Sequence, residues 1–163
     1  MYQIYHRLAR DFGLEMSPAD PGVFTFTIDL WGTVGGRSVR VHRHVGRGGY
    51  ALVRTPLDPP VGIGIGVAPT ALWNHIGALF GMQDIEVGIR DFDRAFQVRA
   101  REEARVREVL SPAVCAALLG IPAEARMSDV EVEASVGHRD ESYDVLAGMI
   151  RWVVEVARLV RPR

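Results

Sequence analysis

RDFDRAFQVRAREEARVREVLSPAVCAALLG, residues 90–120, decides the fold class that this sequence predicts. Phe96 and Val98 alternate with polar residues, which is typical of a half-buried strand. Residues 101–110 are rich in helix formers, and Ser111-Pro112 begins a second helix with a capping hydroxyl and a proline in the first turn. We therefore expect a turn, a strand, a helix, a break and a helix. This pattern carries information about folding and none about chemistry.

Working outward, the rest of the chain predicts an antiparallel sheet covered by helices. Apolar residues recur at every second position in several segments, so that each strand has one apolar and one polar face. We expect further strands at 23–31, 37–45, 50–55, 61–67, 85–89 and 128–136. We expect further helices at 2–12, 71–80 and 142–160, the last of which is so apolar that it needs cover on more than one side. The predicted class is α+β: one domain over residues 1–163, an antiparallel sheet with helices mainly on one face, and a long C-terminal helix.

Composition restricts the kind of protein further. The 163 residues are 48% hydrophobic and 24% charged, as in a globular chain, and the net charge of −1 gives no overall field for nucleic acid or acidic membranes. The single cysteine, Cys115, excludes an intrachain disulfide, and its small apolar neighbours indicate a buried thiol. No apolar run is long enough to cross a bilayer, and charges interrupt the N-terminal segment where a signal peptide would be apolar. We expect a cytoplasmic protein without membrane insertion.

Charge is unevenly distributed along the chain. Residues 31–56 contain five arginines, two histidines and no acid, whereas residues 128–144 contain six acids and one arginine. Two interpretations remain open. Either the two strands pair and their charges face each other on a solvated sheet, or the Arg-rich hairpin 37–54 binds an anionic partner or the acidic strand of a second copy. The candidate partner-binding residues are Arg37, Arg40, His42, Arg43, His44, Arg47 and Arg54.

The chain contains no recognisable catalytic or cofactor motif. His42 and His44 share a strand face at a spacing that two metal ligands could use, but no third ligand is evident and we expect surface residues. Asp91 and Asp93 are expected to bond to backbone amides in a turn. The glycines of VGIGIGV, residues 61–67, lack the spacing of a dinucleotide-binding loop and indicate the close approach of another backbone or side chain. We predict no catalytic residue, no cofactor and no metal site.

Three functions are compatible with these features. The favoured one is a non-enzymatic interaction or accessory domain that holds an unknown protein partner, or a second copy, through the Arg-rich hairpin. The alternative is a small-ligand-binding protein or enzyme with a pocket between sheet and helices near Trp73, His75 and Trp152, to which His138 could contribute. A second alternative is nucleic-acid binding by the same hairpin, which we do not expect because only Tyr50 offers a stacking platform there.

Four stretches can be compared with known domains. They are LARDFGL (8–14), the hairpin segment 32–41, FDRAFQV (92–98) and VLSPAV (109–114). In this order they resemble a loose family of uncharacterised bacterial domains, some of them attached to membrane segments, with an FD-x-x-F-x-V strand followed by an L-S-P-capped helix. The resemblance implies the same succession of strands and helices, and it implies no catalytic residue and no cofactor.

Overall fold

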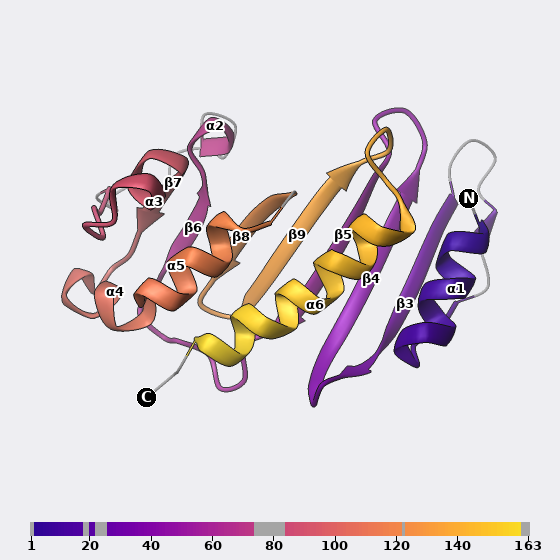
Figure 1. Ribbon diagram of the computed structural model, residues 1–163, viewed down its shortest axis with the longest axis horizontal. Coiled ribbons are helices and arrows are strands. Elements are labelled where there is room, and N and C mark those ends of the chain that lie inside the picture. Colours follow the sequence, from indigo (N-terminus) through magenta and orange to yellow (C-terminus); the bar gives the residue numbers. More distant parts are fainter. Residues whose placement is uncertain (1, 18–19, 22–25, 74–83, 122, 161–163) are drawn as a thin grey trace.

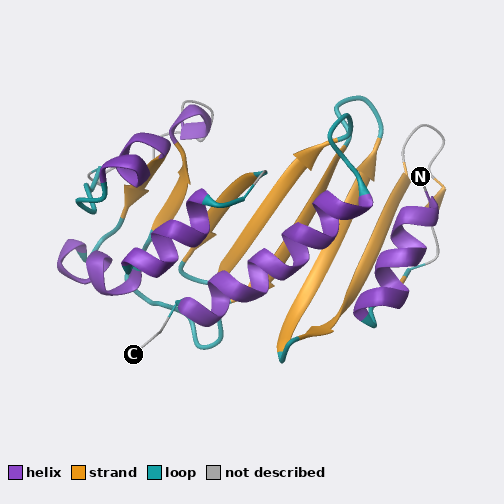
Figure 2. Ribbon diagram, in the orientation of Figure 1, coloured by secondary structure: helices purple, strands orange, loops and turns teal. Residues whose placement is uncertain are grey.

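The computed structural model describes residues 2–17, 20–21, 26–73, 84–121 and 123–160. Within these residues, nine strands form one antiparallel sheet in the order β1-β3-β4-β5-β9-β8-β6-β7, with β2 paired to β3 beside β1. Helices α1, α5 and α6 lie across the same face of that sheet (Figures 1 and 2). The predicted class, an α+β antiparallel sheet with helices on one face and a long C-terminal helix, is confirmed.

The bounds of the elements differ in places from the expected ones. The strands are β1 (Glu15–Met16), β2 (Asp20–Pro21), β3 (Phe26–Val34), β4 (Arg37–Val45), β5 (Tyr50–Pro56), β6 (Gly66–Pro69), β7 (Phe96–Arg99), β8 (Glu124–Ser128) and β9 (Glu131–Gly137). The helices are α1 (Tyr2–Phe12), α2 (Thr70–Trp73), α3 (Arg90–Ala95), α4 (Glu103–Val109), α5 (Pro112–Leu119) and α6 (Tyr143–Leu159).

Helix α6 is the main cover of the sheet. The Ser142 hydroxyl accepts a hydrogen bond from the Val145 amide at 3.2 Å and so caps its first turn. The helix packs on β4, β5 and β9 and is flanked by α1 and α5. It buries Leu146, Ala147, Met149, Ile150, Val153, Val154, Val156 and Ala157. Burial on several sides, which the apolar sequence of this helix predicted, is confirmed.

In the segment 90–120 the predicted strand and both predicted helices are confirmed, and the predicted turn is a helix instead. Residues 90–95 form a short helix, α3, where a turn was expected. The Asp93 carboxylate nevertheless accepts hydrogen bonds from the amides of Val87 and Gly88, both at 2.9 Å, as expected of this side chain. The prediction of a strand at 85–89 was wrong. No strand is formed there: Asp84, just before the segment, makes an isolated bridge with Arg99, and the Ile85 amide donates to the Val98 carbonyl at 2.9 Å.

The glycine-rich segment 61–67 was also expected to be a strand, and only its end is one. Gly62 and Gly64 have φ angles of 75° and 69°, which turn the chain out of an extended conformation. As a result the amides of residues 63, 64 and 65 all point at one carboxylate, Asp129, with donor–acceptor distances of 3.1, 2.6 and 3.0 Å. Consecutive amides of this kind form an anion-binding concavity, and here the anion is a carboxylate of the same chain.

Two further differences concern the strands after α5. Residues 124–127, for which the sequence predicted no strand, form β8 together with Ser128. The last strand begins at Glu131 instead of residue 128, and Val130, expected to point inward, is 53% exposed. Parts of two expected elements, residues 23–25 of the first strand and residues 74–80 of the second helix, lie outside the described residues.

Candidate functional site

The face of the sheet turned away from the helices is the candidate functional site, and we call it the open face. None of the helices in the described part of the chain packs against its centre. Trp31 and Tyr50 lie on it with 38% and 40% of their surface exposed, and Leu52, two residues from Tyr50 along β5, is half-buried. An uncovered sheet face with aromatic side chains is the kind of surface that binds another protein.

The strand register places one row of side chains across the open face. Residues directly opposite each other in an antiparallel sheet point to the same side. Across β3, β4, β5, β9 and β8 these residues are Trp31, Arg40, Arg54, Glu133 and Arg126. Arg126 lies 3.8 Å from Glu133, and Arg54 lies 4.0 Å from Glu131, so the basic strand β5 and the acidic strand β9 do face each other. The solvated-sheet interpretation of the charge pattern is therefore correct for these strands.

Arg40 is the exception in this row. Its direct neighbour on β5 is a second arginine, Arg54, and like charges opposite each other destabilise a sheet. Its other neighbour is Trp31, whose indole N–H donates to Glu15 at 3.0 Å. Among the residues that the structure describes, no carboxylate lies within ion-pair distance of Arg40. Its guanidinium is therefore available to an anionic group from outside.

The two histidines of β4 lie on the same open face and already have neighbours there. His42 Nδ1 is 2.8 Å from a carboxylate oxygen of Asp29. The ring centroids of His42 and His44 lie 6.2 and 5.7 Å from that of Tyr50. Within the described ranges no three side chains of the metal-binding types come together. These contacts make the histidines part of a polar surface.

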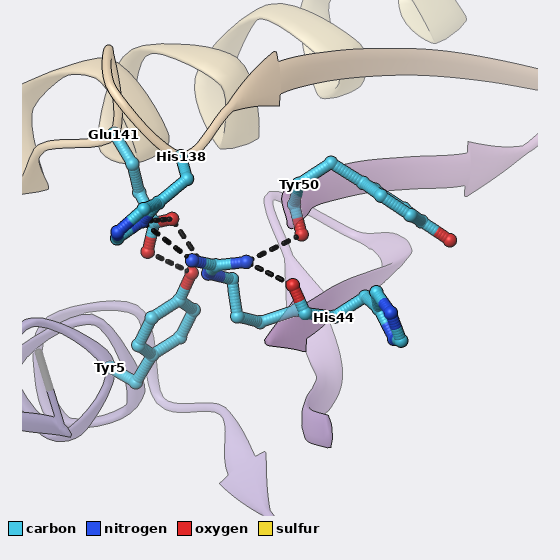
Figure 3. Close-up of polar contacts among 6 residues, drawn as sticks. Tyr5, His44, Tyr50, His138 and Glu141 are labelled. Atoms are coloured by element: carbon cyan, nitrogen blue, oxygen red, sulfur yellow. Dashed lines mark hydrogen bonds and ion pairs between the residues drawn. The ribbon is translucent and has the colours of Figure 1, made fainter. Parts of the chain in front are cut away.

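Arg43, included among the candidate partner-binding residues, lies on the other side of the sheet. Its side chain is 1% exposed, and its Nε is 2.6 Å from a carboxylate oxygen of Glu141. Its Nη1 donates to the carbonyls of Tyr50, at 3.2 Å, and of His44, and its Nη2 is 2.8 Å from His138 Nδ1. Figure 3 shows the side chains of Glu141 and His138 converging on this point. Arg43 cannot reach a partner, and its assignment to an exposed surface was wrong.

We call Arg43, Glu141 and Tyr5 the buried ion-pair network; His138, whose side chain is 56% exposed, lies at its edge. The Tyr5 hydroxyl donates to Glu141 at 2.6 Å, and burial, reinforced by this bond, raises the pKa of Tyr5 far above its ordinary value. The short contact between Arg43 Nε and Glu141 is not aligned as a hydrogen bond, so it acts mainly through charge. The network connects α1, the β4–β5 hairpin and the turn before α6, which is a structural role.

Two other arginines of the predicted set, Arg37 and Arg47, differ in whether their guanidinium groups are free to bind a partner. Arg37 donates to the carbonyls of Asp58 and Ala157 at 3.3 and 3.0 Å, so its guanidinium is already engaged by the chain. Arg47 lies exposed at the tip of the hairpin. The open face thus keeps four of the seven predicted residues: Arg40, His42, His44 and Arg54.

The predicted pocket between sheet and helices is described only in part. Trp152 is half-buried and donates its indole N–H to the Ala117 carbonyl at 2.6 Å, so it joins α6 to α5. The side chain of Trp73 and all of His75 lie outside the described residues. Cys115 is fully buried, as predicted, and burial raises the pKa of its thiol to about 11. A thiol in that state is a poor nucleophile.

Sequence reasoning missed two hollows on the open face. The smaller, of about 150 Å³, is lined by Gly66, Val67, Ala68, Arg126, Met127, Ser128, Glu131 and Glu133. The larger, of about 530 Å³, is lined by Gly48, Gly49, Tyr50, Leu52, Glu124, Arg126, Glu133, Ser135, Val136 and Gly137. Both include the Arg126–Glu133 ion pair, and burial raises the pKa of Glu133 against the opposing effect of Arg126. No local signal reveals these hollows, because the strands that line them are distant in sequence.

The comparisons with known proteins bear on the fold. No protein-family model and no curated protein matches the chain. The structure is similar to the crystal structure of the mycobacterial trehalose monomycolate transport factor A, TtfA, with a TM-score of 0.64 at 10% sequence identity, covering 99% of this chain and 96% of that chain. At this identity the likeness shows a shared fold. The family resemblance carried by the four sequence stretches stays a prediction.

The length and apolarity of the helices bear on whether the chain could cross a membrane. None of the helices in the described ranges is both long enough and apolar enough to span a bilayer.

Proposed function

We propose that this chain is a non-enzymatic accessory domain that binds an acidic segment of a protein partner on its open face. The observation that carries the proposal is Arg40, an exposed guanidinium with another arginine opposite it and no described carboxylate in reach. A carboxylate of a partner segment would neutralise Arg40 and relieve its repulsion with Arg54, whose own guanidinium lies 4.0 Å from Glu131. Guanidinium groups suit this task because they hold carboxylates with two parallel hydrogen bonds.

The aromatic side chains around these arginines support a protein as the occupant. Trp31 is the direct neighbour of Arg40, and Tyr50 lies on the next strand of the same face. Tryptophan, tyrosine and arginine are the residues that most often dominate the binding energy of protein interfaces. Nucleic acid is the weaker occupant, because every nucleotide carries a phosphate that the acids of β9 beside the arginines would repel, whereas a peptide can place neutral residues there.

The structural likeness to TtfA is compatible with this role, since that protein is named a transport factor. A cytoplasmic location is part of the proposal, and the single free thiol, Cys115, fits a reducing compartment.

The proposal is tested with peptides of known sequence. A displayed library of 12-residue peptides is selected on the folded domain, and the enriched peptides are synthesised and titrated by fluorescence anisotropy. We expect enrichment of Asp and Glu, and a loss of affinity of roughly tenfold or more in the double variant Arg40→Glu, Arg54→Glu. The matched control is Arg94→Glu, an exposed arginine on α3.

Three outcomes would contradict the proposal. The first is equal binding of the selected peptides by the double variant and the wild type. The second is enrichment without acidic residues. The third is tighter binding of a single-stranded oligonucleotide than of any peptide at low salt, which would favour nucleic acid as the partner. Thermal melts of all variants establish that a loss of binding is not a loss of folding.

A further inference from the structure

The smaller of the two hollows on the open face has the size and lining of a side-chain pocket. Its volume is about 150 Å³, and small residues of β6, Gly66 and Ala68, leave the space that larger side chains would fill. A cavity of comparable size in a protein core holds a benzene-sized apolar molecule. An aliphatic side chain such as that of leucine therefore fits.

Arg126, which lines this hollow, has one polar atom that is buried without a partner. The Nε of Arg126 is shielded from solvent and finds no hydrogen-bond acceptor among the described residues. A buried donor left unsatisfied costs free energy, and such exceptions in native proteins call for an explanation. The charge of Arg126 is already balanced by Glu133 at 3.8 Å. The missing partner is therefore a neutral acceptor, and the main-chain carbonyl of a bound segment is one. The Arg126 side chain as a whole is 38% exposed, so a rotation on binding would bring its Nε to that carbonyl.

We propose that the hollow is the anchor subsite of the partner segment: it takes one leucine-sized aliphatic side chain, and Arg126 Nε donates to the main-chain carbonyl of that segment. This inference rests on the proposed function and specifies the chemistry of the occupant. Glu131 and Glu133 on the wall of the hollow disfavour an acidic side chain there. The subsite thus separates the apolar residue of the partner from its acidic residues, which bind at Arg40 and Arg54.

The sheet also sets the spacing between these residues. Arg54 is on β5 and Arg126 is on β8, and β9 lies between these strands, so the two arginines are two interstrand distances apart. At about 4.8 Å for each, the span is roughly 10 Å, or about three residues of extended chain. We therefore expect an acidic residue and an aliphatic residue about three positions apart in the bound segment.

The subsite is tested with a neutral probe that cannot use the arginine pair. N-acetyl-leucinamide and its control N-acetyl-glycinamide are titrated into the ¹⁵N-labelled protein, with the amides of Ala68 and Ser128 and the Arg126 Nε–H followed by NMR. We expect saturable shifts at these groups with the leucine probe, at a dissociation constant on the order of millimolar, and roughly tenfold weaker shifts with the glycine probe. Arg126→Met should weaken the binding of the leucine probe several-fold, whereas Arg94→Met should leave that binding unchanged.

The outcomes separate this inference from the proposed function. Equal shifts with both probes, or shifts spread over other parts of the protein, would overturn the subsite, even if the acidic peptides still depend on Arg40 and Arg54. Conversely, the double variant Arg40→Glu, Arg54→Glu should leave the response to the leucine probe unchanged, so the subsite can stand if the acidic site fails. Should Arg126→Met not fold, the comparison of the two probes on the wild type decides alone.

Discussion

Replacing Glu141 by glutamine should lower the free energy of unfolding by about 3–5 kcal/mol, the cost of breaking a buried ion pair on one side. Glutamine keeps the shape of the side chain and an acceptor for the Tyr5 hydroxyl, so the change removes mainly the charge. The side chains of Arg43 and Glu141 are only 1% and 3% exposed, so water cannot replace the lost carboxylate. For a chain of this size the melting temperature should fall by roughly 6–20 °C.

Urea denaturation followed by circular dichroism measures this change. Glu102→Gln is the control, because it breaks an ion pair with Arg105 at the surface, where the two side chains are 53% and 36% exposed. That change should cost less than about 1 kcal/mol. The double variant Arg43→Met, Glu141→Leu should recover much of the loss, since it leaves no unpaired buried charge. Equal stability of Glu141→Gln and Glu102→Gln would refute the structural role assigned to the buried ion-pair network.

Three further predictions concern other buried groups. Asp129→Ala removes the acceptor of three backbone amides and should cost roughly 3 kcal/mol in urea denaturation, whereas the exposed Asp140→Ala should have little effect; equal effects would contradict the backbone concavity. Cys115 should react with a disulfide reagent at pH 8 only when the protein unfolds, because burial raises its thiol pKa to about 11, and immediate reaction of the folded protein would show that the thiol is accessible. The pKa of Tyr5 is raised in the folded state, so the contribution of Tyr5 to the free energy of unfolding is complete below pH 10, the ordinary phenol value, and declines above that pH. Tyr5→Phe should lose that part of the alkaline decline in stability. An unchanged alkaline profile of stability in this variant would contradict the role assigned to Tyr5.

Local patterns predicted the elements that depend on local chemistry. The capped helix after Ser111 and the alternating strands β3, β4 and β5 lie close to where the sequence places them. The inward position of Arg43 was available from the same alternation, because it shares its parity with Val39 and Val41. The charge alone had led to its assignment to the surface. A buried arginine needs a paired acid, and its acid, Glu141, is 98 positions away (141 − 43).

Long-range contacts account for what the sequence could not predict. The glycine segment 61–67 reads as a strand until Asp129 is known to accept its amides, at a separation of 64 to 66 residues. The smaller hollow on the open face is assembled from β6, β8 and β9, and the larger one from β5, β8 and β9, so neither leaves a mark in any one strand. The sequence predicted only in part which residues of the hairpin are exposed. Whether their polar groups are free to bind a partner depends on neighbours that are distant in sequence. Asp29 already contacts His42, and the carbonyls of Asp58 and Ala157 already bind Arg37.

The most direct test of the open face as the binding surface is an NMR titration of the ¹⁵N-labelled protein with a selected acidic peptide. We predict that the largest shifts fall on the open-face residues of β3, β4, β5 and β9, with Arg40 and Arg54 among them, and that α6 shifts little. Shifts concentrated on α1, α5 and α6 would place the partner on the helical side of the molecule and contradict the account.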